Sequence, residues 1–365
     1  MTIPGDHPSY EWQHAILHLD MDAFYVKVHI QDHPEDAGIP LVVGGQPDQR
    51  GVVSSASYEA RLDGIHSAMP TSRAIRMVPE LKIVPPNWER IKARSRQVMS
   101  VLEKYGPVEP MSVDEAYVDL SEHDDPVDTA ATVKQDVKET TSLPCSIGLS
   151  SSKLVAKVAS DHDKPDGFTV VPPGKEAAFL APKPTRAILG IGPQTAKRLA
   201  DLQIHTCGQL AAQDPQRIRQ ALGAYAVAFI ERAQGIDSRR VRTEPRQVKS
   251  ISQEWTFNRD VRDRDLLEKQ LQKMCASVTA SLRKKGLVAH TVTVKIRWAD
   301  FTTFTRQKSY VVGIDSEQEI LQSATAIFRE NWDAKHFVRL LGVGVSNLET
   351  PEVRQLRLSL YSGGS

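Results

Sequence analysis

The sequence predicts an α+β protein of several domains, and three observations on its 365 residues support this prediction. Strand patterns alternate with helix patterns through the first half of the chain, whereas residues 186–236 have a helical pattern throughout. Residues 248–348 show the pattern strand, helix, two strands, helix, strand. Because one hydrophobic core rarely extends over so many residues, we expect two to four domains.

The first half of the chain is predicted to form one sheet domain, interrupted by an insertion at about 32–86. A Pro-Pro pair at 85–86 marks the end of that insertion. In chain order, the predicted elements are a strand and a helix within 13–31, strands at 41–43 and 52–54, helices at 57–62, 71–78 and 88–105, a strand region at 108–120, a helix at 126–140, a strand at 145–150 and a helix from about Ser152.

The helical middle part is predicted to be a separate domain, because a stretch rich in Pro, Gly and Ala at 172–185 precedes it. Within it, Gly190 and Gly192 form a Gly-x-Gly turn between two predicted helices, as in a helix-hairpin-helix. Such a turn exposes backbone N–H groups at a helix start, which suits a DNA phosphate. A plain interhelical turn is the alternative.

A polar, basic segment at 239–247 is predicted to link this part to the last domain. In the last domain, residues 291–298 alternate between polar and apolar, which places Lys295 and Arg297 on one face of a strand. Arg306 and Lys308 on the next strand favour a DNA-facing sheet over an ordinary solvated one.

The distribution of charge supports a nucleic-acid partner, although the net charge is only +1. Residues 1–240 hold 26 Lys/Arg against 31 Asp/Glu, residues 241–310 hold 15 against 7, and the remainder holds 5 against 7. A basic segment beside an acidic one is typical of a phosphate-contacting surface. A solvated basic face is the alternative.

Membrane and disulfide-rich classes are not expected. No apolar run approaches the length of a membrane span, and the polar first twelve residues contain no signal-peptide core. Cys145, Cys207 and Cys275 are far apart and fit no zinc or redox spacing. We therefore expect a cytoplasmic protein.

Two acidic motifs carry the predicted chemistry. Asp20-Met21-Asp22 follows an apolar strand pattern, and Asp114-Glu115 precedes another. Carboxylates gathered at strand ends repel one another unless a cation lies between them, and Mg²⁺ takes oxygen ligands of this kind. Two such ions held close together catalyse phosphoryl transfer. For Asp22, capping of the following helix is the preferred interpretation.

These motifs closely resemble those of the Y-family translesion DNA polymerases, the DinB type in particular, over nearly the whole chain. The residues that carry the resemblance are Leu19-Asp20-Met21-Asp22-Ala23-Phe24-Tyr25, Val52 to Arg61, Ser67-Ala68-Met69-Pro70, Ser112-Val113-Asp114-Glu115-Ala116-Tyr117, Asp163-Lys164-Pro165-Asp166-Gly167, the Gly-x-Gly turn, Lys249-Ser250 and Glu254-Trp255-Thr256-Phe257.

The resemblance implies a right-hand polymerase that performs low-fidelity translesion synthesis on primer-template DNA with incoming dNTPs, as a monomer. Its implied domains are a ferredoxin-like palm at 1–31 and 87–175, small fingers at 32–86, a helical thumb at 176–238, a linker at 239–247, an α+β little finger at 248–348 and a tail at 349–365.

The resemblance also implies residue roles. Asp20, Asp114 and Glu115 would be catalytic and, with the Met21 carbonyl, would bind two Mg²⁺ ions, for which Mn²⁺ can substitute. Tyr25 would be the steric gate that excludes a 2′-OH. Further nucleotide contacts would come from Ala23, Phe24, Ser55, Tyr58, Arg61 and Lys164, and DNA contacts from Gly190, Gly192, Lys249, Ser250, Lys295, Arg297 and Arg306.

The tail resembles the short peptide by which bacterial polymerases bind the sliding clamp. Its expected contacts are Gln355, Leu356, Leu358 and Leu360, with the last two as pocket anchors. The sequence departs from the family pattern at Lys27 and His29, where a small residue and an acid are usual, and at Ser55 and His66, where threonine and a basic residue are common.

Two other classes of protein are compatible with parts of this pattern. A non-catalytic DNA-binding accessory on the same fold would lose the carboxylates, but this chain keeps all three. A palm-fold nucleotidyl cyclase would need neither a thumb nor a basic last domain. The polymerase hypothesis is therefore preferred.

Overall fold

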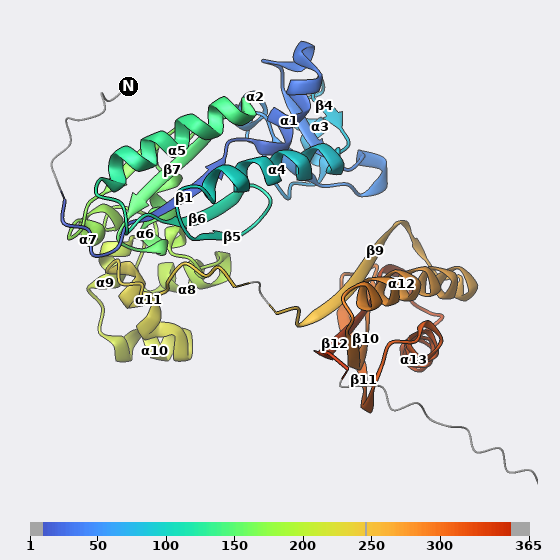
Figure 1. The fold of residues 1–365 in the computed structure, drawn as a ribbon. Coiled ribbons are helices and arrows are strands. Elements are labelled where there is room, and N and C mark those ends of the chain that lie inside the picture. Colours follow the sequence, from blue (N-terminus) through green and yellow to red (C-terminus); the bar gives the residue numbers. More distant parts are fainter. Residues whose placement is uncertain (1–9, 245–246, 352–365) are drawn as a thin grey trace, which may run out of the picture. The chain divides into compact units, whose positions relative to one another are not determined.

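The structure is a computed structural model that describes residues 10–244 and 247–351 (Figure 1). It divides into two compact units, which are considered separately below. One holds Met1–Gly45 and Val52–Pro245, and the other holds Gln46–Gly51 and Arg246–Ser365. Among the described helices, none is long and apolar enough to cross a membrane.

A five-stranded sheet forms the centre of the first unit, with strand order β5-β6-β1-β7-β8. Leu17 and Leu19 pack against α4 and α5, whereas Ile16 packs against Ala156 of α6. Because side chains alternate along a strand, α6 covers the opposite face from α4 and α5. The elements are β1 (Ile16–Met21), α4 (Trp88–Leu102), β5 (Val108–Pro110), β6 (Glu115–Asp119), α5 (Pro126–Thr141), β7 (Cys145–Ser150), α6 (Lys153–Ser160) and β8 (Phe168–Val171).

Helix α6 lies unusually close to the sheet. The side chain of Ser152 caps its first turn by accepting from the N–H of Val155. A Cβ atom on Gly148 of β7 would lie 2.1 Å from the carbonyl oxygen of Ala156 and 2.4 Å from the amide nitrogen of Ser160. The absence of a side chain at Gly148 therefore lets α6 rest directly on β7.

A smaller, three-stranded sheet of order β3-β2-β4 accompanies the large one. Strand β4 is parallel to β2 and was not predicted, because it is only three residues long and precedes a Pro-Pro pair. The elements of this region are α1 (Phe24–Asp32), η1 (Pro34–Asp36), β2 (Leu41–Gly44), β3 (Val53–Ala56), α2 (Tyr58–Leu62), α3 (Thr71–Met77) and β4 (Lys82–Val84), whereas η2 (Pro47–Gln49), between β2 and β3 in the chain, belongs to the second unit.

The rest of the first unit is helical, and its helices share one buried core. The segment predicted as a bare boundary at 172–185 contains a short helix, α7, whose Leu180 joins this core. The elements are α7 (Glu176–Leu180), η3 (Thr185–Ala187), α8 (Pro193–Asp201), α9 (Cys207–Ala211), α10 (Pro215–Leu222), η4 (Gly223–Tyr225) and α11 (Ala226–Ala233).

After α11 the chain returns to the large sheet. The N–H of Arg242 donates to the carboxylate of Glu109 at 2.8 Å, and Val241 packs against Tyr117 and its neighbours. The first part of the predicted linker is therefore packed against the sheet that carries the acidic motifs.

The second unit has a four-stranded antiparallel sheet of order β11-β10-β12-β9. Val292, Val294 and Ile296 of β10 are buried with α12 and α13, as the alternation predicted. The predicted order of strands and helices is confirmed: β9 (Ser250–Val261), α12 (Arg264–Lys284), β10 (Val288–Trp298), β11 (Thr303–Ile314), α13 (Glu317–Asn331) and β12 (Val338–Glu349).

Candidate active site

The two acidic motifs meet at one end of the large sheet. Strands β1 and β6 are antiparallel, with Asp20 opposite Glu115. The N–H of Met21 donates to the carbonyl oxygen of Asp114 at 2.9 Å. Pairing of the strands therefore brings together carboxylates that are far apart in the sequence.

A pocket of about 140 Å³ opens beside these acids. Every residue predicted to contact the nucleotide lines it, whereas Glu115 does not. Ser54 and Ser67 also line it and were not predicted, because a single serine carries no pattern of its own. The lining consists of Asp20, Met21, Asp22, Ala23, Phe24, Tyr25, Ser54, Ser55, Tyr58, Arg61, Ser67, Asp114 and Lys164.

Asp20 lies in an environment that disfavours its charge. Burial raises the pKa of Asp20 to about 6, although the ammonium group of Lys164, 2.7 Å from Oδ1, acts in the opposite direction. The nearby carboxylates of Asp161 and Asp114 raise this pKa further. An additional cation would relieve both effects, so Asp20 has the surroundings of a cation ligand.

Glu115, in contrast to Asp20, lies in an environment that favours its charged form. The imidazole of His18 and the ammonium group of Lys157, both nearest to Oε2, lower the pKa of Glu115 to about 2 against the effect of burial. Burial lowers the pKa of His18 itself, which favours a neutral imidazole. Asp114 accepts a hydrogen bond from the hydroxyl of Ser112.

The donor chemistry of this site fits divalent cations. Three carboxylates and a backbone carbonyl are hard oxygen ligands of the kind that Mg²⁺ prefers. Among the described residues no three acidic, His or Cys side chains converge on a single point. Instead, Lys164 contacts Asp20 and Lys157 contacts Glu115. Each lysine supplies positive charge to an acid that would otherwise be uncompensated.

Asp22 does not cap α1, so that prediction is wrong. The N-cap residue is Ala23, with φ of 44° and no side-chain cap. Asp22 is buried and accepts hydrogen bonds from the Ser146 hydroxyl at 3.0 Å, the backbone N–H of Asp166 at 2.8 Å and the Tyr58 hydroxyl at 3.1 Å. It therefore joins the pocket wall to β7 and to the Lys-Pro-Asp-Gly turn.

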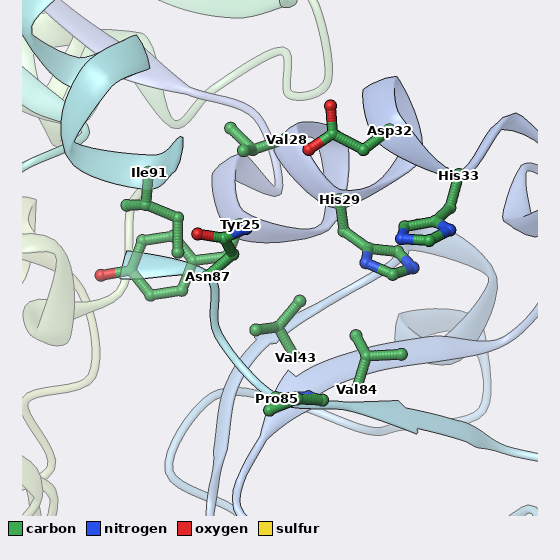
Figure 2. A pocket seen from close by; sticks show the side chains of 10 residues that line it. All are labelled: Tyr25, Val28, His29, Asp32, His33, Val43, Val84, Pro85, Asn87 and Ile91. Atoms are coloured by element: carbon green, nitrogen blue, oxygen red, sulfur yellow. The ribbon is translucent and has the colours of Figure 1, made fainter. Parts of the chain in front are cut away.

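Tyr25 borders both the 140 Å³ pocket and a second cavity of about 250 Å³ (Figure 2). Figure 2 shows its ring beside Ile91 and Asn87 at one end of this cavity, with His29 and His33 toward the other end. The Tyr25 ring meets Trp88 edge-on, with centroids 5.6 Å apart. Phe24, in contrast, is buried in the core of the sheet domain.

The predicted phosphate contacts lie on or near α2. The guanidinium of Arg61 lies 4.8 Å from the centre of the Tyr58 ring, and its Nε donates to the carbonyl of Ala56 at 3.0 Å. Burial raises the pKa of Tyr58 to about 12, so this phenol stays protonated and can donate. Ser55 is buried and lines the same pocket.

The departure at His29 has a structural explanation. Nε2 of His29 lies 2.8 Å from Oδ2 of Asp36, and Nζ of Lys82 lies 2.5 Å from Oδ1 of the same carboxylate. Hydrogen bonds from Lys82 and His29 lower the pKa of Asp36, whose side chain has little solvent contact. A basic residue at position 29 therefore balances an acid within the small-sheet region. Nothing in the structure explains Lys27.

The glycines of the predicted hairpin lie where the prediction placed them. Gly190 has φ of 100°, a left-handed conformation that favours glycine, and Gly192 is the N-cap of α8. Arg232 Nη1 donates to the carbonyl of Leu189 at 2.9 Å and holds the turn in place. A cavity of about 510 Å³ is lined by both glycines, Lys157 and Arg186 among others.

On the sheet of the second unit, the two predicted cations of β10 differ in their partners. Lys295 Nζ lies 2.8 Å from Glu254 on β9, across Gly342, which has no side chain between them. Arg297 donates from Nε to the Thr303 hydroxyl at 2.7 Å. Lys249 and Ser250 are exposed at the start of β9.

Arg306 and Lys308 do not extend this face, which corrects the prediction about the sheet. Arg306 lies opposite Val294 and Lys308 opposite Val292. Residues directly opposite each other point to the same side of a sheet, so both cations project toward the helix-bearing face. The predicted clamp contacts Gln355, Leu356, Leu358 and Leu360 lie outside the described residues.

Comparison with known proteins identifies the class of protein. Residues 19–161 match the impB/mucB/samB family, and residues 248–358 match the C-terminal domain of that family. DNA polymerase IV of Dehalococcoides mccartyi is 40% identical over 349 residues, covering 94% of this chain and 89% of the relative. DNA polymerase IV of Alkalilimnicola ehrlichii is 39% identical over 354 residues, covering 95% and 99%.

Solved structures agree. A chimeric Y-family DNA polymerase matches with a TM-score of 0.82 at 25% identity, covering 92% of this chain and all of its own. The insertion ternary complex of Dbh DNA polymerase matches with a TM-score of 0.63 at 25% identity, covering 92% of this chain and all of its own. The chain therefore belongs to the Y family of DNA polymerases, whose members are DNA-directed DNA polymerases. Within that family, the curated relatives above carry the name DNA polymerase IV, and the predicted multidomain α+β fold is confirmed.

Proposed function

We propose that this chain adds deoxynucleotides to a primer 3′-OH by two-metal phosphoryl transfer and copies past damaged template bases. The observation that carries the proposal is the 140 Å³ pocket, where Asp20 and Asp114 meet Tyr25, Arg61 and Lys164. Acids for cations, cations for phosphates and an aromatic ring for the sugar are the groups that a nucleotide-transfer site needs.

In this proposal Asp20, Asp114 and Glu115, with the carbonyl of Met21, hold two Mg²⁺ ions. When bound, these ions make the 3′-OH a better nucleophile and neutralise charge on the triphosphate. Lys164 now lies 2.7 Å from Asp20 and would turn toward the phosphates once Asp20 has another partner.

The other lining residues select and orient the nucleotide. Arg61 presents a planar fork of donors that suits a phosphate, and Tyr58 supports its guanidinium from below. Tyr25 would lie under the sugar and clash with a 2′-OH, so that ribonucleotides fit poorly.

We also propose the domain assignment and partners that the sequence indicates. The palm comprises 1–31 and 87–175, the fingers 32–86, the thumb 176–238, the linker 239–247, the little finger 248–348 and the tail 349–365. The N–H groups at the start of α8 and the open face around Arg297 would contact the template duplex. We expect a cytoplasmic monomer that binds the sliding clamp through residues 355–360.

Primer extension tests the proposal. Wild-type protein with Mg²⁺ should extend a primer on an undamaged template and past an abasic site. Asp114→Ala should reduce the rate on the order of a thousandfold, because a lost metal ligand removes several kcal/mol of transition-state stabilisation. Asp124→Ala removes an exposed loop acid and should extend normally. A wild-type protein that adds no nucleotide would refute the proposal.

A further inference from the structure

His18 occupies a fixed position in the centre of the large sheet. It lies opposite Tyr117 of β6 and Gly148 of β7, and its side chain is fully buried. The His18 and Tyr117 rings lie 4.7 Å apart. Because Gly148 lets α6 rest on the sheet, Ser160 of that helix reaches the imidazole. The orientation of the ring is therefore set from several sides.

The two ring nitrogens of His18 face different neighbours. Nδ1 lies 2.8 Å from the hydroxyl oxygen of Ser160. Nε2 is buried without a close hydrogen-bond partner among the described residues, and it lies 3.5 Å from Oε2 of Glu115. Burying a polar nitrogen without a partner is unfavourable. The direction of Nε2 toward a carboxylate of the candidate active site therefore indicates a role for His18 beside Glu115.

The hydrogen-bonding capacity of these groups determines where the proton lies. The carboxylate of Glu115 can only accept, so His18 facing it presents a proton on Nε2. On the other side of the ring, the Ser160 hydroxyl donates to the carbonyl oxygen of Lys157 at 2.8 Å. It has one hydrogen, so Nδ1 either donates to the Ser160 oxygen or draws the hydroxyl hydrogen away from that carbonyl. Ser160 therefore influences which tautomer His18 adopts.

We propose that His18 is a positioning residue that donates from Nε2 to Oε2 of Glu115 and leaves Oε1 turned toward a divalent cation. This inference rests on the proposed function, because it takes Glu115 as a metal ligand. Lys157 contacts the same Oε2. The imidazole is held from several sides, so it can orient the carboxylate through this one hydrogen bond.

Mn²⁺ binding tests this proposal without requiring turnover. The full chain is mixed with a dideoxy-terminated primer-template and the complementary dNTP, and free Mn²⁺ is followed by electron paramagnetic resonance. His18→Phe keeps a ring but loses the donor, and it should weaken one Mn²⁺ site by about tenfold, since partners of metal ligands typically change affinity by that factor or more.

Three further variants separate positioning from packing. His18→Gln retains an N–H that can reach the carboxylate and should recover most of the affinity. Ser160→Ala removes the partner of Nδ1 and should weaken the same Mn²⁺ site, but less than His18→Phe does. Ser150→Ala removes another buried hydroxyl from β7, opposite Ile16 and away from the acids, and should bind Mn²⁺ as the wild type does.

The outcomes are distinguishable. Equal Mn²⁺ affinity in wild type and His18→Phe would overturn the role of His18 while leaving the proposed function intact. A wild-type complex that binds no Mn²⁺ would count against the proposed function itself. Thermal unfolding and primer-template affinity are measured in parallel. If His18→Phe does not fold, wild-type affinity in Ser160→Ala, which retains the imidazole, overturns the proposal.

Discussion

At the scale of single residues, Tyr25 contacts two aromatic neighbours, Phe24 and Trp88. Trp88 meets its ring edge-on, and a cavity of about 250 Å³ beside the ring offers space into which it could move (Figure 2). An aromatic pair of this kind contributes roughly 0.5–1.5 kcal/mol beyond simple burial. If Tyr25 selects the sugar, Trp88 should help to keep it in place.

Replacing Trp88 should therefore relax sugar selectivity. We expect Trp88→Ala to lower the preference for dNTP over rNTP by about threefold to tenfold, as the loss of one aromatic contact implies. Tyr25→Ala should lower it further, and Trp88→Phe should change it little. Single-turnover incorporation of matched dNTP and rNTP measures this ratio. Unchanged selectivity in Trp88→Ala, with selectivity lost in Tyr25→Ala, would remove Trp88 from the argument.

Single residues also show what local sequence can and cannot predict. The pattern around Asp20 and Glu115 predicted acids at strand ends, and the register of β1 and β6 places them side by side. Asp22 was predicted wrongly, because its partners Tyr58, Ser146 and Asp166 belong to distant segments. From the sequence alone, such a carboxylate cannot be distinguished from a helix cap, because its hydrogen-bond donors come from segments far along the chain.

At the scale of elements, Lys295 and Arg297 of β10 have different partners on the sheet of the second unit, although the sequence predicts the same role for both. Lys295 is paired with Glu254, so its charge is already compensated. Arg297 is hydrogen-bonded to the uncharged Thr303. Arg297 should therefore contribute more to phosphate binding than Lys295, although the two are neighbours on one face of β10.

Binding to a primer-template at several salt concentrations tests this difference. Arg297→Ala should weaken affinity by about threefold to tenfold and reduce the salt dependence by about one phosphate contact. Lys295→Ala should have a smaller effect, and Glu254→Gln should strengthen binding by freeing the lysine. Equal losses for the two cation variants would show that the ion pair opens on DNA.

Elements differ in how well the sequence predicts them. Strand β10 could be predicted from its alternation of polar and apolar residues, because one face packs on helices and the other does not. Strands β4 and β8, of three and four residues, were not predicted, and they form because β2 and β7 offer parallel edges. The side of the sheet toward which Arg306 projects could not be predicted from the sequence either, since it depends on the register between β10 and β11.

At the scale of the whole molecule, charge and chemistry are divided along the chain. The acidic pocket lies within the first unit, whereas residues 241–310 hold 15 Lys/Arg against 7 Asp/Glu. Such a division suits an enzyme that binds cations at one place and a polyanion over a larger surface. A duplex held mainly by charge exchanges readily, so synthesis by this chain alone should be distributive.

The proposed clamp-binding tail would make synthesis processive. In the proposed function, Gln355, Leu358 and Leu360 would fill apolar pockets on a sliding clamp, and tethering to the clamp would raise the effective concentration at the primer end. Deleting residues 355–365 should abolish clamp binding and clamp-stimulated extension while leaving extension without clamp unchanged. Leu358→Ala with Leu360→Ala should act like the deletion, whereas Arg357→Ala, directly before the first anchor, should retain binding. Surface plasmon resonance on immobilised clamp and product-length analysis measure the two effects, and clamp affinity retained after the deletion would place the contact elsewhere in the chain.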